Sequence, residues 1–125
     1  MIVTDNRVAA FVGERCGVAF VPPWTCMGIE KDGEIIGGVI FNVFEGADVH
    51  MSVAGRGWNA GFLAEVGHYV FDILKCERLT AQTEQPSVVR LAERLGGKLE
   101  GLKRNHFGKD RDAFIVGILK EDWKF

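Results

Sequence analysis

Hydrophobic and polar positions follow two different periods along this chain. Residues 47–53 alternate strictly, with Asp48, His50 and Ser52 between apolar residues, which predicts a half-buried strand with one polar face. The segment that follows the loop at 55–61 repeats its apolar residues at intervals of three and four as far as about residue 75. That spacing predicts an amphipathic helix. The two periods together indicate a protein that contains both strands and helices.

Turn and capping signals delimit the other elements. Thr4 or Asp5 is expected to cap a first helix that ends near Gly17. The Asp-Gly pair at 32–33 supplies the positive φ angles of a tight turn and predicts a hairpin. The remaining predicted elements are strands at 24–30 and 35–44, a strand at 78–83, a helix that starts at Pro86, a short strand at 98–103 and a buried final strand at 113–119.

The order of these elements indicates the fold class. A helix and a three-stranded meander come first, and then helix, strand, helix, strand and strand follow. Such an order predicts an α+β (α/β) domain in which helices pack on a mixed sheet. A length of 125 residues suits one domain, so we expect 1–125 to fold as a single unit.

Composition and charge narrow the class of protein. The chain is 47% hydrophobic and 26% charged, which is ordinary for a globular protein and excludes intrinsic disorder. Its net charge of −2 argues against a nucleic-acid partner, and no apolar run approaches a membrane span. Three cysteines without a Cys-x-x-Cys pair predict neither a disulfide framework nor a metal site. We expect a cytoplasmic location, since no signal peptide is visible.

The loop between the alternating strand and the second helix carries the clearest chemical signal. Gly57, Gly61 and Asn59 lie where backbone N–H groups at a helix N-terminus can approach an anion, and Arg56 adds a positive charge. This pattern favours a phosphate or pyrophosphate cradle, although it is neither a P-loop nor a dinucleotide fingerprint. The alternative is a glycine-rich turn that only starts a helix.

Two sequence motifs resemble the GNAT superfamily of acyl-CoA-dependent N-acyltransferases. The first, Arg56-Gly57-Trp58-Asn59-Ala60-Gly61, is similar to the family's pyrophosphate loop. The second, Arg-Leu-Ala-Glu-Arg-Leu-Gly-Gly-Lys-Leu-Glu-Gly at 90–101, resembles its ribosomal-protein-acetyltransferase-like subgroup, which has bacterial and phage-encoded members. The likeness spans roughly residues 25–120. It implies a mixed, mostly antiparallel sheet flanked by helices, with the first strand reduced to Ile2 and Val3 or lost.

The resemblance also implies an activity and its residues. The expected reaction is transfer of an acetyl group from acetyl-CoA, as co-substrate, to an unidentified primary amine. The catalytic base is expected at His50, with Asp48 and Glu45 as alternatives, because an imidazole commonly serves as a general base. A surface histidine is the simpler reading of His50. The residues expected to bind the cofactor are Ser52, Val53, Arg56, Gly57, Trp58, Asn59, Ala60, Gly61 and Gln85.

Several departures from the family pattern support a second hypothesis. Asn59 replaces a glycine, Gln85 replaces an asparagine, and Ala92 stands where many members carry the tyrosine that protonates the departing thiolate. The alternative is therefore a catalytically degenerate interaction module with the same fold and weak or no CoA binding.

Aromatic and basic residues complete the candidates. We expect Tyr69 in the core or at its rim. Core packing is the simplest expectation for each tryptophan; the alternatives are Trp24 beside the acceptor, Trp58 over the CoA or at the acceptor site, and Trp123 at a sheet edge or subunit contact. Exposed aromatic residues favour a homodimer. The basic stretch at 98–111 predicts a solvated loop, with an anion site as the alternative.

Overall fold

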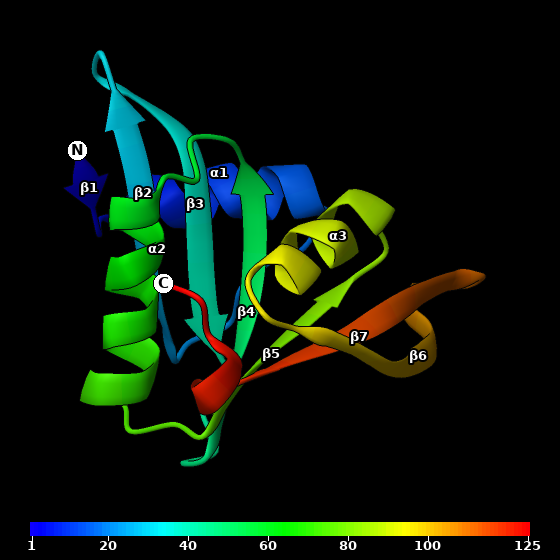
Figure 1. Ribbon diagram of the computed structural model, residues 1–125. Coiled ribbons are helices and arrows are strands. Elements are labelled where there is room, and N and C mark those ends of the chain that lie inside the picture. The colour runs from blue at the N-terminus through cyan, green and yellow to red at the C-terminus, as the bar shows by residue number, and fades with distance from the viewer.

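The computed structural model describes residues 1–125 and contains one seven-stranded sheet with helices on both faces (Figure 1). In chain order the elements are β1 (Ile2–Val3), α1 (Asn6–Cys16), β2 (Trp24–Lys31), β3 (Glu34–Asn42), β4 (Asp48–Gly55), α2 (Ala60–Gly67), the π-helix η1 (His68–Ile73), β5 (Arg78–Thr83), α3 (Pro86–Arg94), β6 (Lys98–Gly108), β7 (Arg111–Leu119) and the 3₁₀ turn η2 (Lys120–Asp122). No helix is long and apolar enough to cross a membrane.

The sheet is mostly antiparallel, as the sequence predicts. Its strand order is β1-β2-β3-β4-β5-β7-β6, and only the central pair, β4 and β5, runs parallel. The parallel pair requires a crossover, which α2 and η1 supply. The expected reduction of the first strand is confirmed, because β1 has two residues that pair with the end of β2.

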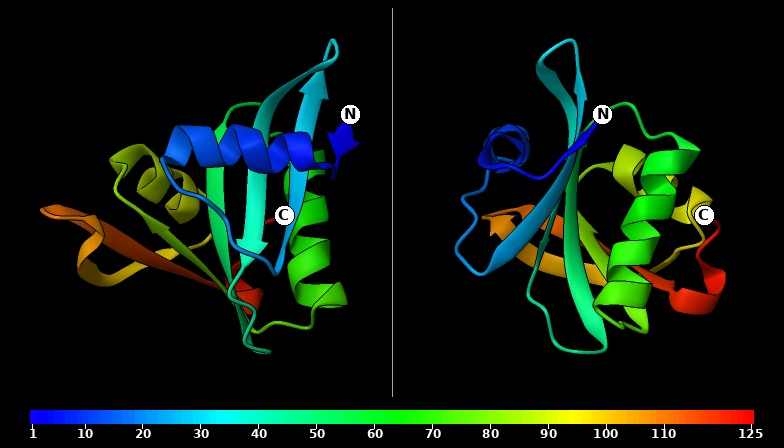
Figure 2. Two further views of the ribbon diagram at one scale, coloured as in Figure 1. Left: turned by 180° about the vertical axis from the view of Figure 1, so that it is seen from behind. Right: turned by 90° about the vertical axis from the view of Figure 1, so that its left-hand side faces the viewer.

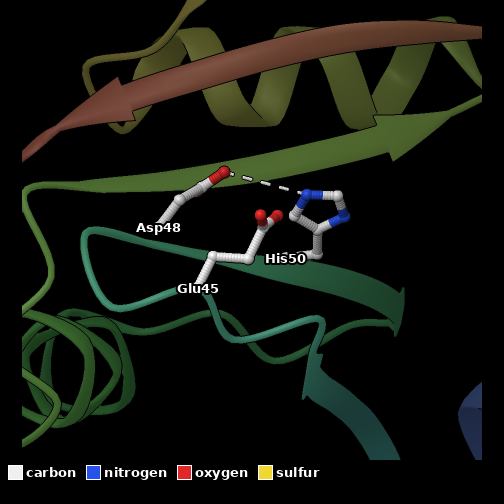
Figure 3. A group of neighbouring side chains, drawn as sticks. All are labelled: Glu45, Asp48 and His50. Atoms are coloured by element: carbon white, nitrogen blue, oxygen red, sulfur yellow. Dashed lines mark ion pairs between the residues drawn. The ribbon is translucent and has the colours of Figure 1, made fainter.

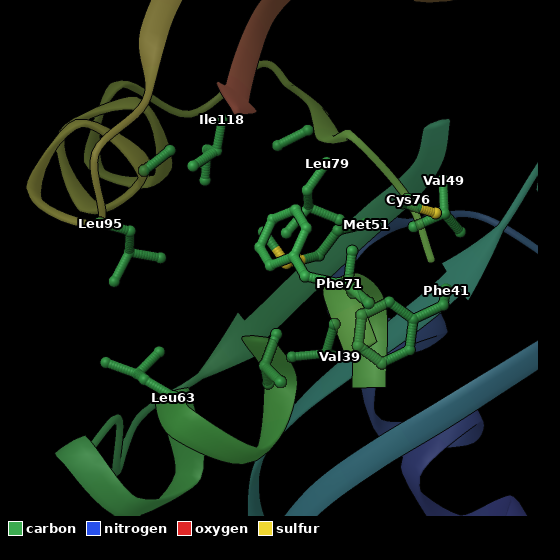
Figure 4. Packing of buried hydrophobic residues seen from close by; sticks show 14 of the residues in the cluster. Val39, Phe41, Val49, Met51, Leu63, Phe71, Cys76, Leu79, Leu95 and Ile118 are labelled. Atoms are coloured by element: carbon green, nitrogen blue, oxygen red, sulfur yellow. The ribbon is translucent and has the colours of Figure 1, made fainter. Parts of the chain in front are cut away.

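Two apolar cores lie on opposite faces of this sheet. Helix α1 covers one face, and α2 and α3 cover the other (Figure 2). The larger core joins α2, η1 and α3 to the sheet through 17 buried residues, among them Val49 and Met51 of β4 (Figure 4). The smaller core seats α1 on β2 and β3 through Val8 and Val12. Strand β4 therefore directs its apolar positions toward α2, and its polar positions lie on the α1 side.

The local signals at turns and caps act as expected. Asp5 precedes α1, and its carboxylate accepts a hydrogen bond from the backbone N–H of Arg7. Gly17 ends the helix in the left-handed conformation. Asp32 and Gly33 both have positive φ, which matches the turn that Asp-Gly pairs favour between β2 and β3.

Three predicted boundaries are wrong. Strand β3 ends at Asn42 instead of residue 44, because Val43 turns the backbone to a φ of 49°. The helix expected to reach residue 75 leaves α-helical geometry after Gly67 and continues as η1. The basic stretch is not a loop but the 11-residue strand β6 and its hairpin with β7. Cross-strand pairing with the apolar β7 overrides the polar composition of β6.

Trp123 packs on the larger core, which is the simplest of the places expected for it. Its ring packs 5.8 Å from that of Phe71, between centroids, against the larger core. The backbone N–H of Lys124 donates to the carbonyl of Leu95 and so ties the C-terminal segment to the end of α3. The C-terminus thus closes the space between α2 and α3 (Figure 1).

Candidate active site

The central parallel pair of strands opens into a V. Strands β4 and β5 are paired from Asp48 to Met51 and from Arg78 to Ala81, and beyond these residues they diverge. Ser52 and Val53 continue to pair with β3, whereas Gln82 and Thr83 pair with β7. The sheet therefore has an opening at its centre, and the side of β4 that faces β5 carries backbone groups without a strand partner.

Two hollows meet at this opening. A cleft of about 240 Å³ lies on the α1 side, and His50, Ser52 and His106 are among the residues that line it. A wider hollow of about 510 Å³ lies beside α3 and is lined by Ala54, Gly55, Trp58 and Arg94. Both hollows are lined by Val53, Gln85 and Val88, so they are continuous at the point where the strands diverge.

The loop after β4 is fixed by close backbone approach. Gly55 has a φ of 92°, and a Cβ at this position would overlap the carbonyl oxygen of Ile36. The backbone N–H of Arg56 donates to that same oxygen over 2.9 Å. Gly57 also has a positive φ, of 98°. Glycine is needed here because other residues rarely adopt this conformation, so the predicted loop has the backbone geometry that its glycines indicated.

Asn59 has a different role from the one its place in the motif suggests. Its backbone is extended, with a φ of −96°, so it does not supply the left-handed turn of a glycine. Its side chain caps α2 and accepts a hydrogen bond from the backbone N–H of Phe62 over 2.8 Å. The N–H groups of Ala60 and Gly61 remain at the helix start, where Gly61 is exposed.

Two arginines that sequence analysis missed line the wider hollow. Arg15, near the end of α1, stacks its guanidinium 3.4 Å from the centroid of the Phe11 ring. Arg94 lies on the same face of α3 as Ser87 and Leu91, at positions i, i+4 and i+7. This helical spacing is the sequence signal that could have identified it. Neither arginine forms an ion pair, nor does Arg56. Unpaired guanidinium groups suit the oxygens of a phosphate.

The polar face of β4 gathers around Asp48. The hydroxyl of Thr80 donates to this carboxylate, with distances of 2.8 and 2.9 Å to its two oxygens. The Nε2 atom of His50 lies 3.8 Å from Asp48 Oδ2 (Figure 3). On the other oxygen, Nε of Arg78 lies 3.6 Å from Oδ1. Asp48 is thus held between three polar groups, and His50 lies between it and the cleft.

Glu45 brings a third ligand-bearing side chain to this group. One atom each from Glu45, Asp48 and His50 lies within 4.8 Å of the others (Figure 3). The hydroxyl of Thr80 and the guanidinium of Arg78 already occupy Asp48, and the positive charge of Arg78 disfavours a cation beside it. These contacts of Asp48 therefore disfavour a metal ion in this group.

His106 is a second imidazole in the cleft. It projects from the β6–β7 hairpin, on the wall opposite β4. Burial, the charge of Lys103 and the neighbouring His50 lower the pKa of His106 below its usual 6.5. Beside it, Glu84 pairs with Arg111 and thereby joins the hairpin to the end of β5. Sequence analysis assigned His106 only to a basic stretch, because the bend of this hairpin has no local signature.

The other aromatic candidates, and Ala92 at the motif position where many family members have a tyrosine, lie outside the cleft. Tyr69 lies at the rim of the core, as expected, and its hydroxyl is 2.7 Å from that of Thr25. Trp24 lines a separate groove and not the cleft. Trp58 packs on Phe62 and lines the wider hollow. Ala92 is buried in the core, so no hydroxyl reaches the opening from its position.

Comparisons with known proteins identify the fold. No protein-family model and no curated protein matches the sequence. Mutant forms of the spermidine/spermine N-acetyltransferase SpeG from Vibrio cholerae match with a TM-score of 0.74 and 15% identity, over 97% of this chain and 95% of theirs. A chimera of V. cholerae SpeG and hSSAT matches with a TM-score of 0.64 and 20% identity, over 78% of this chain and 68% of its own.

A third structure gives the same result. V. cholerae SpeG in complex with manganese ions matches with a TM-score of 0.64 and 20% identity, over 78% of this chain and 66% of that one. At these identities the likeness concerns the fold. The mixed sheet flanked by helices is therefore the GNAT fold that the sequence resemblance implied.

Proposed function

We propose that this chain is an N-acyltransferase that moves an acetyl group from acetyl-CoA to a primary amine. The observation that carries the proposal is the opening between β4 and β5, which joins two chemically different hollows. Unpaired arginines surround one hollow, and the other contains His50 beside Asp48. Such an opening suits a donor and an acceptor that approach from opposite sides and react between the strands.

The wider hollow suits the CoA portion of the donor. Arg15 and Arg94 line this hollow and offer guanidinium groups to the phosphates. Arg56 and the N–H groups of Ala60 and Gly61 belong to the adjoining loop and helix start, outside the hollow, and in the proposal they bind phosphate groups that extend beyond it. The backbone of Ser52 and Val53 is available to the amide-bearing arm, much as an extended peptide adds to a strand edge. Gln85 lies where the two hollows join and can contact the same arm.

The cleft on the α1 side suits the amine. In the proposed reaction His50 accepts a proton from the ammonium group, and the free amine attacks the thioester carbonyl carbon. The C–N bond forms, the C–S bond breaks, and the amine nitrogen loses its second proton to water as the thiolate departs. Asp48 stabilises the imidazolium ion that forms on His50. The thiolate takes its proton from water, because Ala92 offers no acid.

Ligand-induced stabilisation tests the proposal directly. Acetyl-CoA should raise the Tm of the protein, since a ligand at 100 times its Kd adds about 2.7 kcal/mol to the free energy of unfolding. Incubation with a panel of primary amines should then release free CoA thiol and yield acetylated amine, both detectable by mass spectrometry. The matched control is the same buffer and amines without acetyl-CoA.

The same experiment separates the proposal from the interaction-module hypothesis. A Tm that does not move at millimolar acetyl-CoA would contradict the proposal and support a module that lost its cofactor. A Tm that rises without any acetylated product would retain the donor site and reject the catalytic assignment of His50.

A further inference from the structure

An apolar groove of about 520 Å³ lies next to the proposed acceptor cleft. It is formed where the coil before β2 meets the end of β3 and the helix η1, and it contains no charged side chain. Its volume falls within the range of roughly 300–1,000 Å³ that is usual for small-molecule sites. Its lining includes Val21, Trp24, Val43, Phe44 and Tyr69.

The rim of this groove exposes an unusual amount of apolar surface. Val21 is 77% exposed, Phe44 is 55% exposed and Val43 is 50% exposed, although each could have packed on the nearby core. Exposed apolar side chains that gather around one hollow typically mark a binding site. The groove therefore has the composition of a site for an apolar group.

Asn42 and Val43 border both the groove and the cleft. Asn42 is also the cross-strand partner of His50. Side chains at such paired positions share a face of the sheet and have Cβ atoms about 4.5–5.5 Å apart. The cleft and the groove therefore meet at Asn42 and Val43, and beyond them the groove continues onto the face of the sheet that carries Phe41 and Val49.

Val43, at the junction of the two hollows, has a strained backbone. Its φ of 49° lies in the left-handed region, which a β-branched side chain rarely adopts. Local strain of this kind concentrates at binding and catalytic sites. Because of this conformation the chain leaves β3 at Asn42, and the side chains of Val43 and Phe44 stand at the rim of the groove.

The far side of the groove carries its polar groups. The hydroxyls of Tyr69 and Thr25 lie 2.7 Å apart and hydrogen-bond to each other. Tyr69 belongs to the π-helix η1, and π-helical turns are frequent at functional sites. An apolar hollow with a few convergent polar groups is the usual design of a ligand pocket.

We propose that this groove receives the apolar part of the acceptor, so that the acceptor is a primary amine with a bulky apolar substituent. The inference rests on the proposed function. The acidic group of Glu45 and Asp48 lies near His50 and favours the ammonium end. A polyamine would instead have to place a second ammonium group in a groove without any charged partner, which costs free energy.

Acetylation of a matched set of amines tests the inference. We expect kcat/KM for phenethylamine to exceed that for ethylamine and for spermidine by at least about tenfold, because each methylene in an apolar pocket contributes about that factor. Phe44→Ser should abolish this preference for phenethylamine over ethylamine. The control is Leu102→Ser, which alters an equally exposed leucine on β6 and should keep the preference.

Each outcome decides the inference. Equal or faster acetylation of spermidine, with a Tm that still rises in acetyl-CoA, would overturn it and leave the proposed function in place. Absence of a Tm rise and of any product would reject both. Calorimetric titration with phenethylamine gives a readout without turnover, and loss of binding in Phe44→Ser supports the groove. If Phe44→Ser instead dissociates a dimer in sedimentation without changing selectivity, the groove is a subunit contact and the inference fails.

Discussion

Trp123 packs so closely against Gly67 that a Cβ on the glycine would overlap the indole nitrogen. This nitrogen is buried and has no hydrogen-bond partner. The absence of a side chain at Gly67 therefore lets the C-terminal segment approach the end of α2. The contact joins residues that are more than fifty positions apart, and it covers the side of the larger core that the sheet leaves open.

This relationship predicts a coupled effect on stability. Gly67→Ala should lower the free energy of unfolding by about 1–3 kcal/mol, the usual cost of overpacking a buried contact. The same substitution should cost much less in a Trp123→Ala background, because the overlapping indole is then absent. Chemical denaturation of the two single variants and the double variant measures the coupling. Additive effects would show that the two residues do not constrain each other.

The strained backbone at Val43 predicts a gain in stability. Val43→Asn should raise the free energy of unfolding by about 1 kcal/mol, since asparagine tolerates the left-handed region that costs a β-branched residue about that much. Val21→Asn is the matched control, because Val21 is exposed and does not have a positive φ. A Tm that rises equally in both variants would attribute the gain to surface polarity instead of strain.

Much of the fold is encoded by signals that act within a few residues. Asp5, Gly17 and the Asp-Gly turn each set a boundary that the sequence predicts correctly, because caps and turns depend on local chemistry. The alternation in β4 likewise predicts which of its faces meets the core. Local signals do not predict the full length of strand β6, because it is stabilised by pairing with β7 and not by the residues next to it in sequence.

The candidate site is only partly readable for the same reason. His50 lines the cleft and Gly57 has a positive φ, whereas Gly61 belongs to helix α2. Arg15, Arg94 and His106 reach the opening from elements that are distant in sequence, and nothing near them indicates a shared ligand. Asn59 shows the converse limit, because a motif position taken for a turn is in fact a helix cap.

The cysteine thiols predict a pH-dependent reactivity. Burial raises the pKa of Cys16 above 9.0, so near neutral pH this group is a thiol and not a reactive thiolate. Its sulfur lies 3.6 Å from the carbonyl oxygen of Val53, which accepts the weak S–H bond. Alkylation of Cys16 by iodoacetamide should be slower than that of free cysteine at pH 8 and should keep rising above pH 9.

Peptide-level mass spectrometry over a pH series measures this rate. Acetyl-CoA should slow the reaction further, because the sulfur of Cys16 lies against Val53, which also lines the proposed donor site. Cys76, buried in the core, serves as the internal control that acetyl-CoA leaves unaffected. A Cys16 rate that levels off below pH 8 would contradict the raised pKa.

The proposed base predicts a selective loss of turnover. His50→Ala should lower kcat/KM for the amine by about 100-fold, the usual contribution of a general base, and leave the affinity for acetyl-CoA intact. Asp48→Asn should cause a smaller loss, since Asp48 acts through His50. His68→Ala is the matched control, because this histidine is exposed and pairs with Asp72 away from the cleft. Equal losses in the His50 and His68 variants would remove His50 from the reaction.

Arg94 is the arginine of α3 that lines the wider hollow, and it forms no ion pair. Arg94→Ala should weaken acetyl-CoA binding by about tenfold. This loss is smaller than a buried charge-assisted hydrogen bond would give, because the side chain is exposed. Arg90→Ala is the matched control, since Arg90 belongs to the same helix but does not line the hollow. The change should appear in KM for acetyl-CoA and much less in kcat, because phosphate contacts are equally strong in the ground state and the transition state. Added salt should weaken binding to the unmodified protein more than to Arg94→Ala, as screening predicts for a surface ion contact. Calorimetric titration at two ionic strengths measures both effects, and an Arg94→Ala variant with unchanged affinity and salt dependence would place the phosphates elsewhere.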